Sequence, residues 1–224
     1  AVSGITVLIW IWKKRCIGKI FLLIRKKQRI IGVFFAAAAF LGAVYMGRSL
    51  KNYRTAAESY EIIRKEVEII SQDTEHSGME IDEEKLKKIN PDYSFWIRIL
   101  GTAVDYPVVW SKEEECYLDH GFDGKEQIGG AIFADSGRIP FVSANTIVYG
   151  HNMKDGSMFG DLKKYKDPKF AGEHPYIEIY RHGKWISCPV IASKLIEENE
   201  ATPYQNGTEK ILTLSTCYGK TKRM

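Results

Sequence analysis

Hydrophobic positions divide the sequence into three parts with different periodicities. An uninterrupted apolar run comes first, from Ile30 to Gly47, with eighteen residues and no charge. Apolar residues then recur every three or four positions between Leu50 and Ile70, which predicts one apolar stripe on a helix of about 22 residues. After Tyr93 the apolar and β-branched runs are short, and Gly, Pro and Asp clusters separate them, a pattern typical of strands.

The short runs predict a mainly β domain. Many strands with few helices favour a closed β-barrel over a parallel sheet. A short helix with acidic residues in its first turn is expected over Asp82–Ile89, and a helical turn around Met158–Lys164. The expected strands are Ser94–Ile99, Val104–Val109, Gly130–Phe133, Thr146–Tyr149, Tyr176–Tyr180, Lys184–Ile196 with room for a bend at Pro189, and Lys210–Ser215.

The first apolar run is long enough to cross a membrane. At about 1.5 Å per residue, Ile30–Gly47 spans roughly 27 Å, close to the hydrocarbon thickness of a bilayer. Eight Lys and Arg residues lie between Lys13 and Arg29, and only three follow the run closely. The positive-inside rule therefore predicts a cytoplasmic amino end and an extracellular domain. The alternative is a cleaved signal peptide, but no good small-x-small cleavage site follows the run.

Charge is distributed unevenly along the chain. Residues 1–57 contain eleven Lys and Arg and no Asp or Glu, which leaves 21 basic against 28 acidic residues in 58–224, a net charge of −7. A basic amino end on an acidic body is typical of a membrane-anchored protein and argues against a nucleic-acid partner. The expected organisation is a basic cytoplasmic segment at 1–29, a transmembrane anchor at 30–47, a helical stalk with flanking helices at 48–89, and the β domain at 90–224.

Candidate chemistry lies at the ends of two predicted strands. His151 follows Thr146–Tyr149, and Cys217 follows the run that ends at Ser215. Together with Arg223 they supply an imidazole, a thiol and a fixed cation, the groups that acyl transfer through a thioester requires. The thiolate is the nucleophile, the imidazole exchanges protons, and the planar guanidinium suits an oxyanion.

Each of these residues also has an ordinary structural interpretation. A free cysteine at a strand end is more often buried and inert than nucleophilic, and Arg223 in isolation would be a surface charge. His151 is the only one of the five histidines in a strand-end Tyr-Gly-His setting. Cys116 and Cys188 are expected to pack as small apolar residues, and a disulfide between them is the less favoured alternative.

No metal and no cofactor is assigned. The four cysteines show neither a CxxC pair nor metal-type spacing. Three aspartates could be proposed as metal ligands or as a third catalytic residue, but they lie in loop-like contexts and are expected to cap turns: Asp135, Asp155 and Asp161.

The strings around the candidate residues resemble class B sortases. Asn145–Phe159 is similar to the histidine segment of that class, Leu214–Cys217 to its cysteine strand, and Thr221–Arg223 to the approach to its arginine. The resemblance runs from about residue 90 to the end of the sequence, and its further strings are Asn90–Tyr93, Trp96–Ile99, Asp105–Val109, Tyr117–Leu118 and Phe122–Lys125.

This resemblance implies a membrane-anchored cysteine transpeptidase with a sortase-type barrel and an amino-terminal helix. It implies cleavage of a carboxy-terminal sorting signal after Thr on a secreted protein, and transfer of that protein to a peptidoglycan precursor or another amine of a Gram-positive cell wall. The implied catalytic residues are His151, Cys217 and Arg223. Leu118, Tyr149 and Ser215 would line the substrate groove, and Tyr204 would lie in the loop that helps select the signal.

Two other functions stay open. A pilus-assembling sortase would use the same chemistry with a pilin lysine as the acceptor. In sortases the arginine opens a further core strand, whereas this sequence stops one residue after Arg223, at Met224. The last barrel strand is therefore expected to be missing, and a catalytically inactive, membrane-anchored binding domain is the alternative from another class.

Overall fold

The computed structural model describes residues 3–70, 79–112, 117–197, 210–218 and 222–223, with side chains for 26–68, 80–112, 117–196 and 210–216. The chain forms two units, Ala1–Lys51 and Asn52–Met224. The described residues of the first unit all belong to helix α1 (Ser3–Val67), whose last residues belong to the second unit.

The amino-terminal part of α1 is apolar and exposed. Among the described residues, one helical segment, Lys26–Val67, is long and apolar enough to cross a membrane by its length and composition. Large side chains such as Ile30, Phe34 and Phe40 are more than 60% exposed there. An exposed apolar surface of this size is strongly unfavourable in water, and the anchor at 30–47 stays a prediction.

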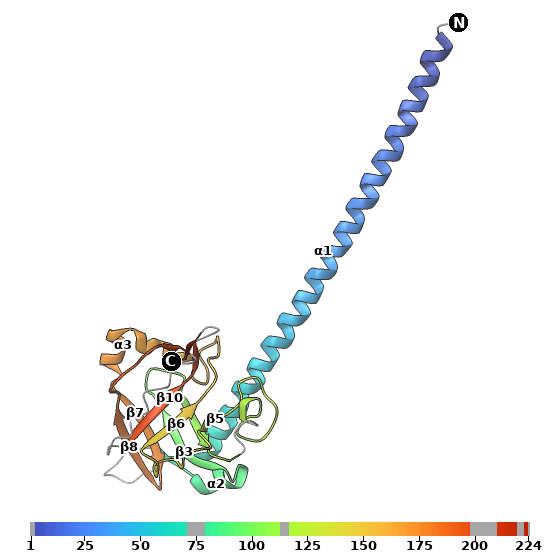
Figure 1. Cartoon of the computed structure of the whole chain (residues 1–224). Helices are drawn as coiled ribbons and strands as arrows, with labels where there is room; N and C mark the ends of the chain where they lie inside the picture. The colour runs from blue at the N-terminus through green and yellow to red at the C-terminus, as the bar shows by residue number, and fades with distance from the viewer. Residues whose placement is uncertain (1–2, 71–78, 113–116, 198–209, 219–221, 224) are drawn as a thin grey trace. The chain divides into compact units, whose positions relative to one another are not determined.

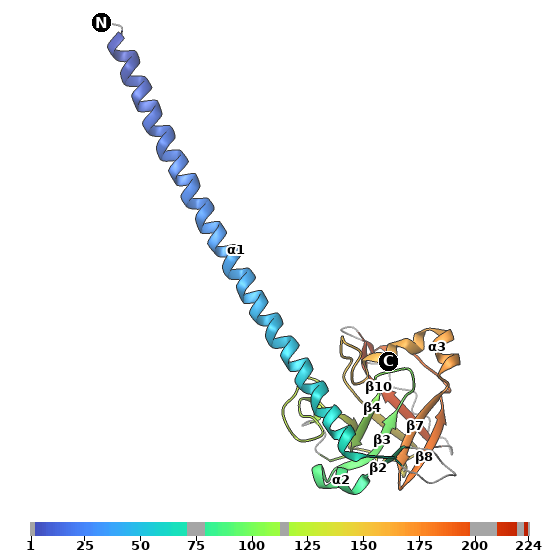
Figure 2. The same ribbon diagram turned by 180° about the vertical axis from the view of Figure 1, so that it is seen from behind.

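The second unit is built on one curled sheet of seven strands (Figures 1 and 2). Its order is β10-β6-β5-β4-β3-β7-β8. The β10–β6 and β4–β5 pairs are parallel, and the other pairs are antiparallel. The strands are β3 (Tyr93–Arg98), β4 (Asp105–Val109), β5 (Ile132–Ala134), β6 (Asn145–Tyr149), β7 (Tyr176–Arg181), β8 (Lys184–Pro189) and β10 (Ile211–Ser215).

Smaller elements surround this sheet. A hairpin joins the end of α1 to the domain, and three short strands, one before β10 and two after it in the chain, form a separate small sheet. These strands are β1 (Glu68–Ile70) and β2 (Met79–Ile81) in the hairpin, and β9 (Ile196–Glu197), β11 (Cys217–Tyr218) and β12 (Lys222–Arg223) in the small sheet. The helices are α2 (Glu83–Ile89), the 3-10 helix η2 (Gly160–Lys166) and α3 (Pro168–Glu173).

The predicted strands are confirmed to within two residues, except for the one expected over Lys184–Ile196. That strand ends at Pro189. Val190 N still donates to Pro175 O at 2.8 Å, one position further in the same register, but Pro175 has no N–H to return a second bond. Closure of the sheet into the expected barrel, whose last strand was predicted to be missing, is not seen among the described strands. Among the described strands, β10 and β8 are its two edges and do not pair with each other.

The carboxy-terminal end of α1 packs on the sheet through the predicted apolar stripe. Tyr60, Ile63 and Val67 are buried at three- and four-residue spacing, as one helix face requires. The helix ends at Val67, and the chain continues directly into β1, where Glu68 pairs with Ile81 of β2. This hairpin was not predicted.

The core is centred on β3. Phe95, Trp96 and Ile97 are consecutive in the strand and are all at most 1% exposed. Successive strand residues point to opposite faces, so both faces of β3 are covered. The polar end of Trp96 is also satisfied, because its indole Nε1 donates to Asp105 Oδ1 at 2.7 Å.

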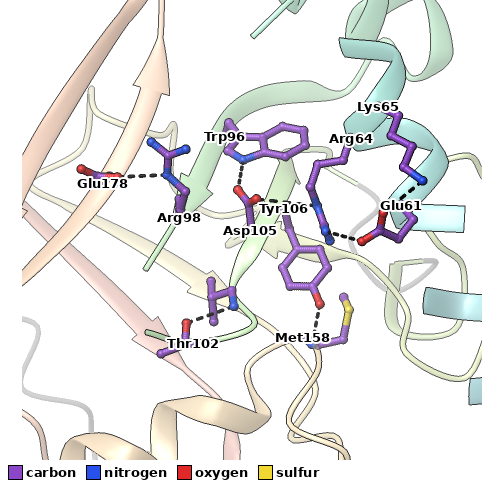
Figure 3. Close-up of polar contacts among 11 residues, drawn as sticks. Glu61, Arg64, Lys65, Trp96, Arg98, Thr102, Asp105, Tyr106, Met158 and Glu178 are labelled. Carbon is purple, nitrogen blue, oxygen red and sulfur yellow. Dashed lines mark hydrogen bonds and ion pairs between the residues drawn. The ribbon is translucent and has the colours of Figure 1, made fainter. Parts of the chain in front are cut away.

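Charged side chains gather where α1 meets β4 (Figure 3). Arg64 Nη1 donates to Glu61 Oε1 at 3.0 Å, and Arg64 Nε lies 3.7 Å from Asp105 Oδ2. Burial raises the pKa of Asp105, an effect that the hydrogen bond from Trp96 and the charges of Arg64 and Arg98 reduce. Ionising the carboxyl group of Asp105 therefore costs more free energy in the folded protein than in the unfolded chain.

This raised pKa predicts a pH dependence with a defined sign. The contribution of Asp105 to stability is complete below its unfolded pKa of about 3.9 and is lost as pH rises through its higher folded value. We expect the free energy of unfolding of the wild type, relative to Asp105→Asn, to increase as pH is lowered from about 7 to about 4. Denaturant titrations of the detergent-solubilised chain over this range measure it.

Asp82→Asn is the matched control, because the contribution of Asp82 to stability changes with pH in the opposite direction. Asp82 caps α2 by accepting from Lys85 N at 3.0 Å, and this bond lowers the pKa of Asp82. Its contribution is therefore present at neutral pH and lost as pH falls, while asparagine preserves the cap. If both variants shifted in the same direction relative to the wild type, the assignment for Asp105 would be wrong.

Candidate active site

Two neighbouring parallel strands lead to two of the candidate residues. β6 and β10 pair in parallel over five positions, and Tyr149 lies opposite Ser215 at the end of the ladder. Neighbouring parallel strands have their carboxyl ends at the same end of the sheet. His151 and Cys217 each come two residues after this last pair, so the register brings their backbones to equivalent positions.

Hydrogen bonds extend this alignment beyond the strands. Gly150 N donates to Ser215 O at 3.2 Å, and Thr216 Oγ1 donates to Gly150 O at 2.8 Å. Thr216 is only 5% exposed, so its hydroxyl is a buried link between the two chain segments. The residues immediately before His151 and Cys217 are therefore bound to each other.

Gly150 leaves room for the packing beneath His151. A Cβ at this position would lie 2.5 Å from Ile132 Cδ1 and 2.8 Å from the ring of Phe159. Phe159 is fully buried, and its backbone N donates to His151 O at 3.0 Å. The glycine thus allows the strand end to lie against the core while the next residue emerges from it.

The imidazole of His151 is half-buried and contacts a loop from a different part of the chain. Its Nε2 lies 2.7 Å from the carbonyl oxygen of Leu118. Because a carbonyl oxygen can only accept, Nε2 carries the hydrogen in this bond. The other ring nitrogen, Nδ1, does not take part in this contact.

Cys217 and Arg223 lie opposite each other in the small sheet. β11 and β12 are antiparallel with Cys217 paired to Arg223, and β12 pairs on its other side with β9, where Arg223 lies opposite Ile196. Residues directly opposite in such a ladder have Cα atoms about 4.5–5.5 Å apart. Since β11 follows β10 after one residue, the Cys217–Arg223 pair lies just beyond the end of β10, and His151 follows the neighbouring end of β6.

The residues predicted to line a groove have different environments. Leu118 is 48% exposed and reaches His151 through its backbone carbonyl. Tyr149 is half-buried, with its ring centroid 5.5 Å from that of Phe133. Ser215 is buried at the end of β10. Tyr204 lies outside the described residues, so its expected role in a selective loop stays a prediction.

Cys188 packs against the core and lies away from the candidate residues in the chain. Cys188 is a free thiol in β8, partly buried against the core, and burial raises its pKa. The expected packing as a small apolar residue is confirmed for Cys188, while Cys116 lies outside the described residues.

The three aspartates in loop contexts accept backbone hydrogen bonds. Asp135 Oδ1 accepts from Gly137 N at 2.8 Å, and Asp155 Oδ1 accepts from Ser157 N at 3.1 Å, so the expected turn caps are confirmed. Asp161 instead bridges two segments, because its Oδ2 accepts from Ala103 N at 3.1 Å and from Lys164 Nζ at 2.8 Å.

Sequence reasoning missed Thr216 as part of the site. Its hydroxyl bond to Gly150 joins strands that are more than sixty residues apart in the chain. A threonine before a cysteine carries no local signal for such a partner. Only the β6–β10 register, known from the fold, indicates it.

Comparison with known proteins agrees with this fold. The family model of the sortase domain matches residues 97–224, more than half of the chain. The chain therefore belongs to the sortase family.

Within that family its relatives are of class B. Sortase B of Listeria monocytogenes is 46% identical over 91 residues, 40% of this chain and 37% of that protein. Sortase B of Staphylococcus aureus is 33% identical over 130 residues, 57% of this chain and 52% of that protein. The matched regions thus span about half, or less, of the length of these curated relatives.

Solved class B structures share the fold. A Bacillus anthracis sortase B in complex with AAEK1 has a TM-score of 0.59 at 27% identity, covering 78% of this chain and 94% of that one. A Staphylococcus aureus sortase B–substrate complex has a TM-score of 0.56 at 27% identity, with coverage of 62% and 80%. Sortase B of Clostridium perfringens gives 0.54 at 29% identity, with coverage of 64% and 100%.

The close packing at Gly150 can be tested by adding one methyl group. We expect Gly150→Ala to lower the free energy of unfolding by about 1–3 kcal/mol, because the new Cβ would overlap Ile132 and the ring of Phe159. Denaturant titration measures this change. Gly172→Ala in α3 is the control, since nothing lies within 4 Å of a Cβ there and alanine favours a helix. Equal stability of both variants would contradict the proposed packing.

Proposed function

We propose that this class B sortase is a cysteine transpeptidase in which Cys217, His151 and Arg223 form the catalytic site. The observation that supports this best is the combination of two registers: Tyr149 opposite Ser215, and Cys217 opposite Arg223. The first aligns the histidine and cysteine segments, and the second puts the arginine across from the cysteine. The residue types are those that acyl transfer through a thioester requires.

The first half-reaction cleaves a peptide. The Cys217 thiolate attacks the carbonyl carbon of a Thr–Gly or Thr–Asn bond in a sorting signal, a C–S bond forms, and the carbonyl oxygen becomes anionic. The Arg223 guanidinium stabilises this oxyanion with directed hydrogen bonds. When the tetrahedral intermediate collapses, the C–N bond breaks and protonated His151 gives its proton to the leaving amine. The product is a thioester on Cys217.

The second half-reaction transfers the acyl group to an amine. Neutral His151 accepts a proton from the incoming amine, whose nitrogen attacks the thioester carbonyl. A new C–N bond forms, the C–S bond breaks, and the Cys217 thiolate is regenerated. The amine that we propose belongs to a cell-wall precursor of a Gram-positive envelope, and the substrates are secreted proteins with a sorting signal.

The first unit supports membrane attachment. We assign residues 30–47 as the membrane span, since the helix there is long, apolar and exposed. The excess of Lys and Arg before the span supports a cytoplasmic amino end. The domain from Asn52 onward would then face the cell exterior, where secreted substrates and cell-wall amines are available.

Removal of the proposed nucleophile is the decisive test. We expect Cys217→Ala to lower hydrolysis of a fluorogenic sorting-signal peptide by at least about a thousandfold and to abolish the acyl-enzyme seen by mass spectrometry. Cys188→Ala is the control and should retain appreciable activity, because Cys188 packs against the core and its pKa is raised by burial. Comparable losses in both variants would refute the assignment.

The proposed oxyanion role of Arg223 requires the shape of the guanidinium as well as its charge. We expect Arg223→Lys to lower kcat by about a hundredfold, because one ammonium cannot reproduce two directed donors. Lys222→Arg, the neighbouring position in β12, is the matched control and should change kcat little. Near-normal turnover by Arg223→Lys would exclude the role.

A further inference from the structure

The carbonyl of Leu118 is held in place by contacts with a second loop. Ala131 N donates to Tyr117 O at 2.9 Å, and Gln127 N donates to Asp119 O at 2.8 Å. The backbone on both sides of Leu118 is therefore paired with residues 127–131. The side chain of Leu118 is half-exposed, so its backbone position depends mainly on these neighbours.

Gly130 fits directly against this carbonyl. Its φ of +55° is one that residues with a side chain rarely adopt. A Cβ there would lie 2.5 Å from Tyr117 O and 2.6 Å from Leu118 O. The backbone of Gly130 therefore packs closely against the carbonyl that His151 contacts.

Helix α1 holds Gly130 from the opposite side. Tyr60 Oη donates to Gly130 O at 2.9 Å in a buried contact, and Gln127 Nε2 donates to the same oxygen at 2.9 Å. Gln127 also lies next to the helix, because its Oε1 is 3.1 Å from Ser59 Oγ, whose hydroxyl also donates to Ala56 O at 2.8 Å. Two consecutive residues of α1 thus contact the segment 127–130, and Tyr60 binds Gly130 directly.

The preceding residue, Tyr117, is fixed independently. Tyr117 Oη donates to Asp92 Oδ2 at 2.7 Å and accepts from Asn90 Nδ2 at 3.1 Å. Asn90 Nδ2 also donates to Phe122 O at 2.9 Å. The turn that carries the Leu118 carbonyl is therefore held from two directions, one of which is α1.

We propose that the Leu118 carbonyl positions His151 with its hydrogen on Nε2, that Tyr60 of α1 maintains this position through Gly130, and that Nδ1 is the nitrogen that exchanges protons during catalysis. This inference rests on the proposed role of His151 in proton transfer. The Nδ1–H of the imidazolium gives its proton to the leaving amine, and the bare Nδ1 then takes one from the incoming amine. Nε2 keeps its hydrogen and its bond to Leu118 O throughout.

The ring nitrogens can be observed without turnover. The full chain is labelled with ¹⁵N-histidine and solubilised in detergent, and His151→Gln identifies the signals of His151. We expect Nε2 to remain at the protonated ¹⁵N position from acid to alkaline pH, while Nδ1 moves from the protonated to the unprotonated position. A bare Nε2 at alkaline pH, or an equal mixture of both tautomers, would overturn the proposal.

A pair of Tyr→Phe variants separates positioning from general stability. Tyr60→Phe loses the bond to Gly130 O, and Tyr165→Phe loses an equivalent bond, since Tyr165 Oη donates to His174 O at 2.9 Å. We expect only Tyr60→Phe to mix the His151 tautomers and to lower kcat for the peptide, by about fivefold with KM unchanged. Equal changes in kcat and in tautomer for the two variants would overturn the role of Tyr60.

The outcomes for the two proposals are distinct. A chain that cleaves no sorting-signal peptide, but shows the expected nitrogen assignments and their change in Tyr60→Phe, would contradict the proposed function and still support the positioning of His151. Peptide cleavage that depends on Cys217 and His151, together with a bare Nε2, would support the function and overturn the positioning.

Discussion

The parallel pairing of β6 and β10 is the constraint on which the candidate active site depends. Ile147 and Val148 of β6 are consecutive and at most 1% exposed, so both faces of the strand are packed, and a one-residue slip would put each side chain into a space that fits another. The core therefore protects the register that aligns His151 with Cys217. Neither residue has to contribute to the core itself. Their common position follows from the strands that precede them.

Two glycines let the backbone approach where the site needs it. Gly150 allows the end of β6 to lie on Phe159, and Gly130 allows a loop to lie on the carbonyl beside His151. In both places a side chain would take the space now used by a backbone or ring atom. The geometry around the imidazole is thus set largely by backbone groups, which have fewer alternative conformations than long side chains.

The carboxy-terminal part of α1 belongs to the domain as much as any strand does. Tyr60, Ile63 and Val67 are part of its core, and Arg64 lies beside the largely buried Asp105. Through Tyr60 the same helix reaches the loop that holds the Leu118 carbonyl. A helix expected to serve as a stalk therefore also contributes to the scaffold of the candidate site.

Local patterns in the sequence were sufficient to predict the strands and the apolar stripe on α1, and to identify the candidate residues at the strand ends. Period-two and three- to four-residue spacings depend on near neighbours, so a sequence displays them directly. The hairpin of β1 and β2, the break after Pro189 and the open edges of the sheet depended on pairings that no local pattern encodes. The hydrogen bonds from Thr216 to Gly150 and from Tyr60 to Gly130 could not be predicted for the same reason, because each joins residues more than sixty positions apart. Residue types and their local periods determined which groups are available, and only the tertiary structure decided which of them meet, because contacts between distant segments exist only once the core has brought them together.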